Sequence, residues 1–255
     1  MIIDSHVHLY AGDFAGDLDE VMARAQLAGV QKFIIPGVDK ASFEPMMSVV
    51  RRYPDRCFPA VGLHPTDVRS DWEAEIEFVV TQLQQQKFTA IGETGLDLHY
   101  GSEFIAEQRR AFEAQLRLSA YHRLPLIIHA REAFEPLFDV LDTVKSLPLR
   151  GVFHAYSGDA ATLRRIRQYG DFKIGVGGVV TFKNAVLADV VKDCALSDMI
   201  LETDAPWLAP VPFRGKRNES AYLSYIVEKI AALKNCTTQE VEDVTTRNAE
   251  QLFAI

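Results

Sequence analysis

The sequence predicts a single-domain α/β protein, a (β/α)₈ TIM barrel, and three observations support this fold class. Eight apolar runs of strand length follow one another roughly 25 to 35 residues apart, a pattern typical of parallel strands buried on both faces. Patterns of helical period lie between most of these runs. The chain has 255 residues, and barrels of this kind use about 250. An open, doubly wound sheet is the alternative that the same alternation allows.

The expected strands alternate along the chain with the expected helices. In chain order the strands are residues 2–6, 32–37, 57–64, 89–97, 125–130, 151–157, 172–178 and 199–206. The clearest helical patterns are 17–30, 73–86, 103–123 and 159–170, and two more, 219–234 and 238–253, close the chain. No linker rich in Gly, Ser or Pro divides residues 1–255, so one domain is expected.

Composition and charge exclude some classes of function. No apolar run reaches the about 18 residues that a membrane span requires. The formal net charge of −8 argues against a broad surface for duplex nucleic acid, but it leaves room for one strand end in a small basic pocket. The N-terminal stretch MIIDSHVHLY lacks the features of a signal peptide, and the three cysteines are widely scattered. A reducing cytoplasm is therefore the expected compartment, and no obligate protein partner is evident.

Polar residues mark the ends of most expected strands, where a barrel of this type builds its active site. His6 and His8, two residues apart on a strand, project to the same face and can hold one metal ion between them. The imidazoles and carboxylates at strand ends include His6, His8, Glu93, His129, His154 and Asp204. Six such groups are too many for one tetrahedral ion and suit two ions that share a carboxylate. We therefore expect two divalent cations per chain, with magnesium, manganese and zinc left open.

A set of ordered motifs carries a resemblance to a known family. The motifs are DSHVH (4–8), GLHP (62–65), IGETGLD (91–97), QRRAFEAQLRLSA (108–120), IIHAREA (127–133), FHAYSG (153–158) and ETDAPWLAP (202–210). Together they resemble the TatD family of metal-dependent deoxyribonucleases, part of a wider amidohydrolase-like group of barrel hydrolases. The resemblance implies one ion held by His6, His8, Glu93 and Asp204, and a second held by Glu93, His129 and His154. Glu93 is the bridge in this scheme.

Other polar residues near the expected rim are candidates for catalysis and substrate binding, beside Asp204 and Glu93. Resemblance and position together suggest that His64 contacts the scissile phosphate or its leaving oxygen. Glu202 shares a strand face with Asp204 and either orients the nucleophilic water or serves only as a hydrogen-bond acceptor. Arg131 is a candidate phosphate clamp, because a guanidinium engages two oxygens at once. A surface ion pair is the alternative for this arginine.

A basic cluster follows the last expected strand in an otherwise acidic chain. Its residues are Arg214, Lys216, Arg217 and Asn218. We expect them to fold over the barrel mouth and to hold phosphate oxygens. The alternative is a solvated basic turn. Loop aromatics also offer faces for bases, and at most two of them are expected to stack: Tyr156, Phe182, Trp207 and Phe213.

The expected function is metal-dependent phosphodiester hydrolysis at single-stranded or frayed DNA ends. In this hypothesis, a hydroxide that bridges the two ions attacks the phosphorus, and Asp204 accepts or steers its proton. A barrel mouth admits a strand end more readily than an intact duplex, and the family precedent points to the 3′ end, with DNA repair and turnover as roles. The alternatives are an amidase, lactonase or deaminase acting on a small molecule, and a non-catalytic metal-binding protein.

Overall fold

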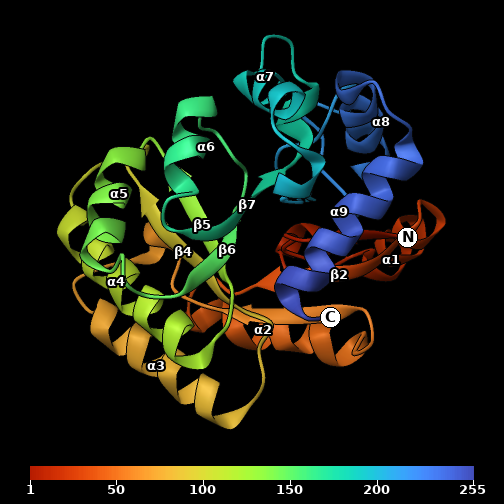
Figure 1. Cartoon of the computed structure of the whole chain (residues 1–255). Helices are drawn as coiled ribbons and strands as arrows, with labels where there is room; N and C mark the ends of the chain where they lie inside the picture. Colours follow the sequence, from red (N-terminus) through yellow and green to blue (C-terminus); the bar gives the residue numbers. More distant parts are fainter.

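Eight parallel strands form the centre of the molecule, and helices surround them (Figure 1). The computed structural model describes residues 1–255. The strands pair in chain order, each with the next. Their bounds are β1 Ile2–Asp4, β2 Val30–Pro36, β3 Cys57–Val61, β4 Ala90–Asp97, β5 Leu126–Arg131, β6 Leu149–Phe153, β7 Gly170–Val176 and β8 Met199–Leu201. The predicted barrel is confirmed, and all eight predicted strands are present.

The sheet closes between β8 and β1 through contacts at and just beyond the ends of these short strands. The amide of Ser5 donates a hydrogen bond to Leu201 O over 3.0 Å. Val7 and Ala205 form an isolated parallel bridge. An open sheet would leave β1 and β8 apart, so the alternative of a doubly wound sheet is wrong.

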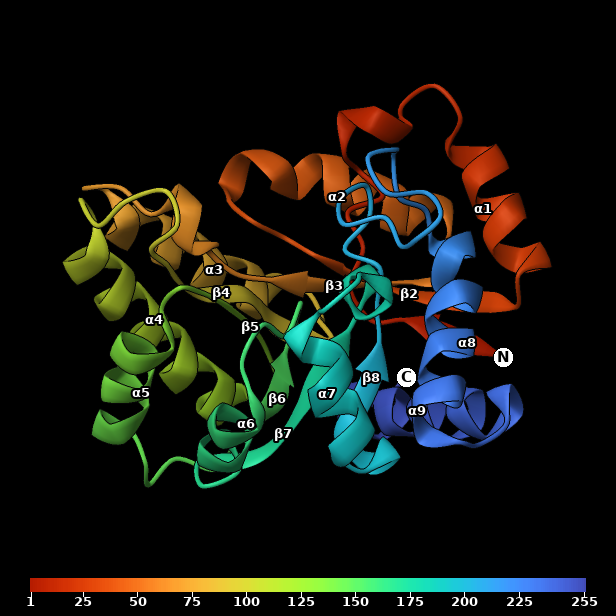
Figure 2. The same cartoon turned by 90° about the horizontal axis from the view of Figure 1, so that it is seen from above.

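Helices cover the outside of the barrel (Figure 2). They are α1 Leu18–Leu27, α2 Lys40–Arg52, α3 Trp72–Gln85, α4 Ile105–His122, α5 Phe134–Thr143, α6 Ala160–Ile166, α7 Val186–Asp193, α8 Leu223–Lys234 and α9 Thr238–Phe253, with 3₁₀ turns η1 Gly12–Phe14, η2 Pro65–Asp67, η3 Gly178–Thr181, η4 Leu196–Asp198 and η5 Ser220–Tyr222. Asp39 and Asp159 start α2 and α6 by accepting hydrogen bonds from backbone amides in the first turn of each helix, Ser42 and Thr162. None of the helices is both long enough and apolar enough to span a bilayer.

An apolar cluster and the last helix plug the amino-terminal end of the barrel. Ala249, Leu252 and Phe253 of α9 pack against one side chain from each of seven strands, namely Ile3, Ile34, Ala60, Ala90, Ile127, Val152 and Ile200. Burial of the larger side chains of this cluster, the Ile, Val, Leu and Phe residues, stabilises the fold by about 1.5–3 kcal/mol each. Aliphatic packing therefore closes this end, and the buried polar groups of the strands lie at the opposite end.

Candidate metal centre and active site

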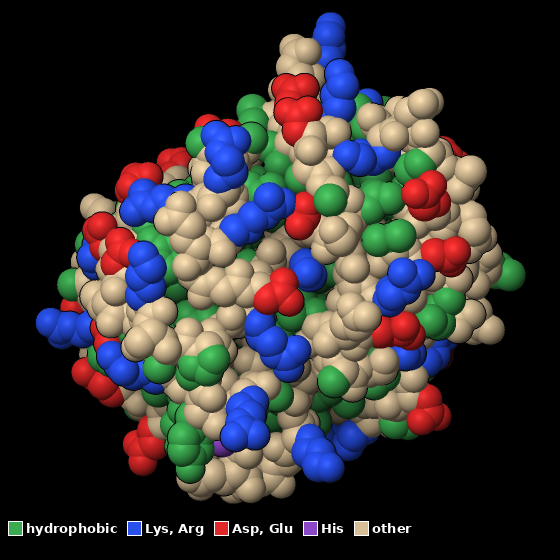
Figure 3. All heavy atoms as spheres, in the orientation of Figure 1, with side chains coloured by type: hydrophobic (Ala, Val, Ile, Leu, Met, Phe, Trp, Pro, Cys, Tyr) green, Lys and Arg blue, Asp and Glu red, His purple; other side chains and the backbone are tan.

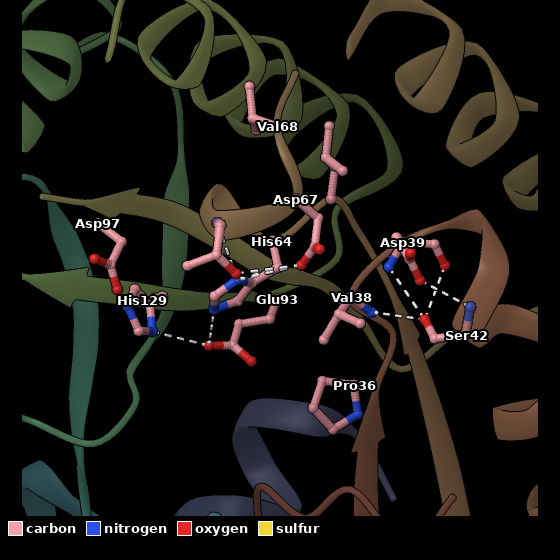
Figure 4. A network of polar contacts seen from close by, with 12 residues as sticks. Pro36, Val38, Asp39, Ser42, His64, Asp67, Val68, Glu93, Asp97 and His129 are labelled. Atoms are coloured by element: carbon pink, nitrogen blue, oxygen red, sulfur yellow. Dashed lines mark hydrogen bonds and ion pairs between the residues drawn. The ribbon is translucent and has the colours of Figure 1, made fainter. Parts of the chain in front are cut away.

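Six potential metal ligands converge at the carboxyl ends of the strands. They are His6 and His8 after β1, Glu93 in β4, His129 in β5, His154 directly after β6 and Asp204 after β8. Four of them are buried, while His129 and Asp204 are partly exposed. Burial of unpaired polar groups costs several kcal/mol, so such a cluster requires compensating partners. Figure 4 shows Glu93 near the middle of one part of it, facing His64 and His129.

One group of four ligand atoms has the spacing of a four-coordinate metal site. Glu93 Oε2 lies 3.1 Å from His6 Nε2 and 3.7 Å from His8 Nε2. Asp204 Oδ1 lies 3.6 Å and 3.5 Å from the same two nitrogens, which are 3.1 Å apart. Ligand atoms about 2.0–2.2 Å from a tetrahedral ion lie about 3.3–3.6 Å from one another. These four side chains therefore fit one divalent ion.

The other oxygen of Glu93 faces a second group of ligands. Glu93 Oε1 lies 2.6 Å from His154 Nε2 and 3.0 Å from His129 Nδ1. These two nitrogens are 3.1 Å apart. Because the two oxygens of one carboxylate face two separate groups, Glu93 is placed to bridge two ions. The residues fit the pair of sites that the resemblance implies.

Tyr10 determines which nitrogen of His8 is free to bind a metal. The Tyr10 hydroxyl donates to Pro36 O over 2.9 Å, and its oxygen lies 2.9 Å from His8 Nδ1. Since its only hydrogen goes to Pro36, Tyr10 accepts one from His8 Nδ1, which leaves the Nε2 lone pair toward Glu93 and Asp204. Tyr10 is not among the site residues predicted from the sequence, although it continues the two-residue spacing of His6 and His8.

Asp97 fixes His129 in the same way. Asp97 Oδ2 lies 2.8 Å from His129 Nε2 and accepts its hydrogen, which leaves Nδ1 toward Glu93. Burial alone would raise the pKa of Asp97, but the hydrogen bond from His129 holds it below its usual value. Asp97 is thus an ionised acceptor that orients a ligand.

His64 presents a hydrogen-bond donor to the same place. The amide of Thr66 donates to His64 Nδ1 over 3.1 Å, so Nδ1 is the acceptor and the neutral ring carries its hydrogen on Nε2. His64 Nε2 lies 3.2 Å from Glu93 Oε1 (Figure 4). A protonated nitrogen donates and does not coordinate, and this geometry agrees with a role in contacting substrate oxygen.

Burial and mutual charge set the protonation of the cluster. Burial alone would raise the pKa of Glu93, but the surrounding histidines hold it well below its usual value. Burial lowers the pKa of His6 to about 4. Burial acts in the same direction on His154, but the charges of Glu93 and Glu202 raise the pKa of that ring to about 10. His154 therefore supplies positive charge beside Glu93, and a metal cation would compete with its proton.

Glu202 lies behind His154, on the side away from Glu93. Glu202 Oε1 accepts a hydrogen bond from the amide of Ala155 and lies 4.0 Å from His154 Nδ1, while Oε2 has no hydrogen-bond partner. Burial raises the pKa of Glu202 to about 8. A Cβ on Gly175 would lie 2.1 Å from Oε2, so the glycine leaves room for this carboxylate. Of the two predicted roles, this position favours that of a hydrogen-bond acceptor, here for the Ala155 amide, over contact with the nucleophile.

Two of the predicted phosphate-binding arginines keep their guanidinium groups free of carboxylates. Arg131 lies over the ring of Tyr100 at 5.4 Å, and Arg214 lies over the ring of Phe182 at 4.5 Å. Both arginines are exposed, and neither forms an ion pair with an acidic residue. The alternative of a surface ion pair for Arg131 is therefore not found, and each group retains donors for an anion.

The structure corrects the roles predicted for Arg217 and Asn218. The Arg217 guanidinium donates to both carboxylate oxygens of Asp17 and to Glu219 Oε1, over 2.7 to 3.0 Å. Asn218 is fully buried, and its side-chain amide donates to Thr203 O and to Trp207 O. Their donors are satisfied within the protein, so both residues hold the β8–α8 connection in place instead of binding phosphate.

One of the four loop aromatics combines high exposure with contact to a ligand. Trp207 is 53% exposed, and its ring lies edge-on to that of His8, with centroids 5.1 Å apart. Tyr156 is buried, and Phe213 stacks on Tyr222 with centroids 4.1 Å apart. Trp207 is therefore the strongest stacking candidate of the four.

Comparison with known proteins identifies the family of this chain. A sequence model of the family described as TatD-related DNase matches residues 3–254, almost the whole chain. The chain belongs to the TatD family. This membership confirms the resemblance drawn from the motifs, and it makes the protein a metal-dependent hydrolase.

Relatives of this TatD-family chain share its full length. YabD of Bacillus subtilis, an uncharacterized metal-dependent hydrolase, is 36% identical over 256 residues, which cover 100% of both chains. The 3′-5′ ssDNA/RNA exonuclease TatD of Salmonella typhimurium is 33% identical, over 100% of this chain and 99% of that protein. The crystal structure of YjjV, a TatD homologue from Escherichia coli, superposes with a TM-score of 0.91 at 30% identity and covers 100% of this chain and 98% of its own.

Proposed function

We propose that this TatD-family hydrolase removes nucleotides from the 3′ ends of single-stranded or frayed DNA with two divalent ions. The observation that carries the proposal is the placement of Glu93, whose two oxygens face two separate groups of ligands at 3.1 Å and 2.6 Å. Paired ions that share a ligand suit displacement at phosphorus, because they stabilise both the attacking and the leaving oxygen. The Salmonella relative named as a 3′-5′ exonuclease supports the same substrate class and polarity.

Each side chain of the site has a part in this reaction. Divalent ions held by the two ligand groups would supply Lewis-acid chemistry that activates water and neutralises the phosphate. His64 Nε2 donates a hydrogen bond to a phosphate oxygen or to the leaving oxygen. Asp204, on the exposed side of the first ligand group, accepts the proton of the attacking water. Arg131 and Arg214 bind the flanking phosphate oxygens with donors that no carboxylate occupies.

The charge distribution favours a strand end over a duplex. The chain carries a formal net charge of −8, and on the face shown in Figure 3, the end of the barrel that α9 covers, Lys and Arg are interspersed with Asp and Glu. Affinity for duplex nucleic acid comes mostly from many contacts of Lys and Arg with phosphates. A few unpaired arginines at the mouth of the barrel suit a single strand that enters by its end.

The test uses single-stranded oligonucleotides labelled at the 5′ end, incubated with magnesium, manganese or zinc. We expect a ladder of products shortened one nucleotide at a time from the 3′ end, which a 3′-terminal phosphorothioate slows. Glu93→Ala should be inactive but still folded, as shown by a measurable unfolding temperature. An RNA strand of the same sequence tests whether the sugar matters.

The proposal is overturned if the wild type and Glu93→Ala leave every strand intact with all three metals. A panel of esters, amides and lactones in the same experiment tests the small-molecule alternative. Metal bound without turnover of any substrate would instead indicate the non-catalytic alternative.

A further inference from the structure

A cavity of about 380 Å³ opens beside the metal centre, between η2 and the β4–α4 connection. Its walls include Arg69 from the segment after η2, and Tyr100, Glu103 and Phe104 from the connection. Sites for small molecules usually measure about 300–1,000 Å³. The volume therefore suits one planar group of nucleotide size.

The cavity lies one hydrogen bond away from the catalytic cluster. Thr66 and Asp97 line it. Thr66 donates its amide hydrogen to His64, and Asp97 accepts the hydrogen of His129 Nε2. Figure 4 shows His64, Asp97 and His129 grouped on neighbouring segments. A group in the cavity would therefore lie next to a phosphate held at His64.

The walls combine aromatic faces with unpaired charges of both signs. Tyr100 is 75% exposed, and Phe104 is half-buried beneath the guanidinium of Arg69, 5.7 Å from its ring centroid. Arg69 uses Nη1 on the carbonyl oxygens of Thr66 and Val68, which leaves its other nitrogens free. Neither Arg69 nor Glu103 forms an ion pair. The cavity thus offers stacking surfaces, hydrogen-bond donors and a strong acceptor together.

We propose that this cavity binds the nucleobase of the terminal nucleotide. A base is the part of a nucleic acid that is planar, stacks on aromatic side chains and carries both acceptors and donors on its edge. Tyr100 stacks on the base, Arg69 donates to its ring or carbonyl acceptors, and Glu103 accepts from its N–H groups. The inference rests on the proposed function and adds a base-binding subsite that holds the strand end in register.

The test measures binding of thymidine and deoxycytidine, which carry no phosphate, by calorimetric titration. Wild type and Tyr121→Ala should bind alike, because Tyr121 is an 83% exposed tyrosine at the far end of α4 and lies outside the cavity. Tyr100→Ala should bind the nucleosides about tenfold more weakly, as expected for one lost base stack. Since Tyr100 is on the surface, the substitution leaves the core intact.

A kinetic experiment separates the base from the phosphate. For the wild type we expect a KM about tenfold higher on a strand with an abasic 3′ end than on an intact strand. In Tyr100→Ala the ratio of the two KM values should approach one. Arg131→Ala should instead raise the KM for both strands equally and leave their ratio unchanged. Because Tyr100→Ala also removes the ring that lies under the Arg131 guanidinium, Arg131→Ala shows how much of the change comes from that arginine alone.

Equal nucleoside affinity in wild type and Tyr100→Ala, or an abasic ratio that persists in the variant, would overturn the inference. A wild type that cleaves no strand with any metal defeats the proposed function instead. In that case the nucleoside titration still decides whether the cavity binds a base.

Discussion

The hydroxyl of Tyr10 lies 2.9 Å from His8 Nδ1 and donates its own hydrogen to Pro36 O, so a tyrosine sets the tautomer of a candidate metal ligand. Burial raises the pKa of this phenol well above its usual value, which keeps the hydroxyl protonated. Partners of this kind orient a ligating imidazole and increase its basicity.

Tyr10→Phe should therefore weaken metal binding about 10- to 100-fold while the barrel stays folded. The measurement is competition with a chromophoric chelator, with thermal unfolding as the check on folding. Tyr121→Phe, which alters an exposed hydroxyl, is the matched control. Unchanged affinity in Tyr10→Phe would show that the hydroxyl does not prepare His8.

Metal content should separate the two ligand groups. His8 belongs to one group and His129 to the other, while Glu93 faces both. Elemental analysis after dialysis should find about two ions per chain in the wild type and about one in either His8→Ala or His129→Ala. Glu93→Ala should retain less than one. A wild type with one ion, or a His129→Ala variant that retains two, would contradict the bridged pair.

The two arginines of the β8–α8 connection should behave differently when replaced by alanine. Arg214→Ala should weaken binding to single strands and reduce the slope of log affinity against log salt by about one. Arg217→Ala should leave that slope unchanged and lower the unfolding temperature by a few degrees, because it breaks the contacts with Asp17 and Glu219. Equal salt slopes for Arg214→Ala and the wild type would remove Arg214 from the substrate path.

Thiol labelling at pH 8 should distinguish the cysteines. Burial raises the pKa of Cys57 to about 12 and that of Cys194 to about 11, so their reactive thiolates are scarce at this pH. Cys236 is partly exposed. Fast labelling of Cys236 alone is expected in the native protein, and of all three cysteines in denaturant. Peptide mapping that finds native Cys57 labelled at the rate of Cys236 would contradict the packing seen here.

Much of the site could be predicted because a parallel barrel converts sequence position into spatial position. Each apolar strand ends at the same rim, so His6, Glu93 and His154 meet even though their separation along the chain is large. The roles of Tyr10 and Thr66 could not be predicted, because the direction of a hydrogen bond depends on which third group takes the remaining hydrogen. For Tyr10 that group is Pro36 O, which lies on the neighbouring strand.

By itself, the sequence determined the fold class, the strands and the set of ligand types at their carboxyl ends, because periodicity and strand order are local properties of the chain. Only the tertiary structure decided the fate of the basic cluster. Arg217 meets Asp17 across 200 positions of sequence, whereas Arg214 meets no carboxylate. The path of the loop over the barrel decides which basic side chains lie next to a carboxylate. A guanidinium paired with a carboxylate is not available to a substrate.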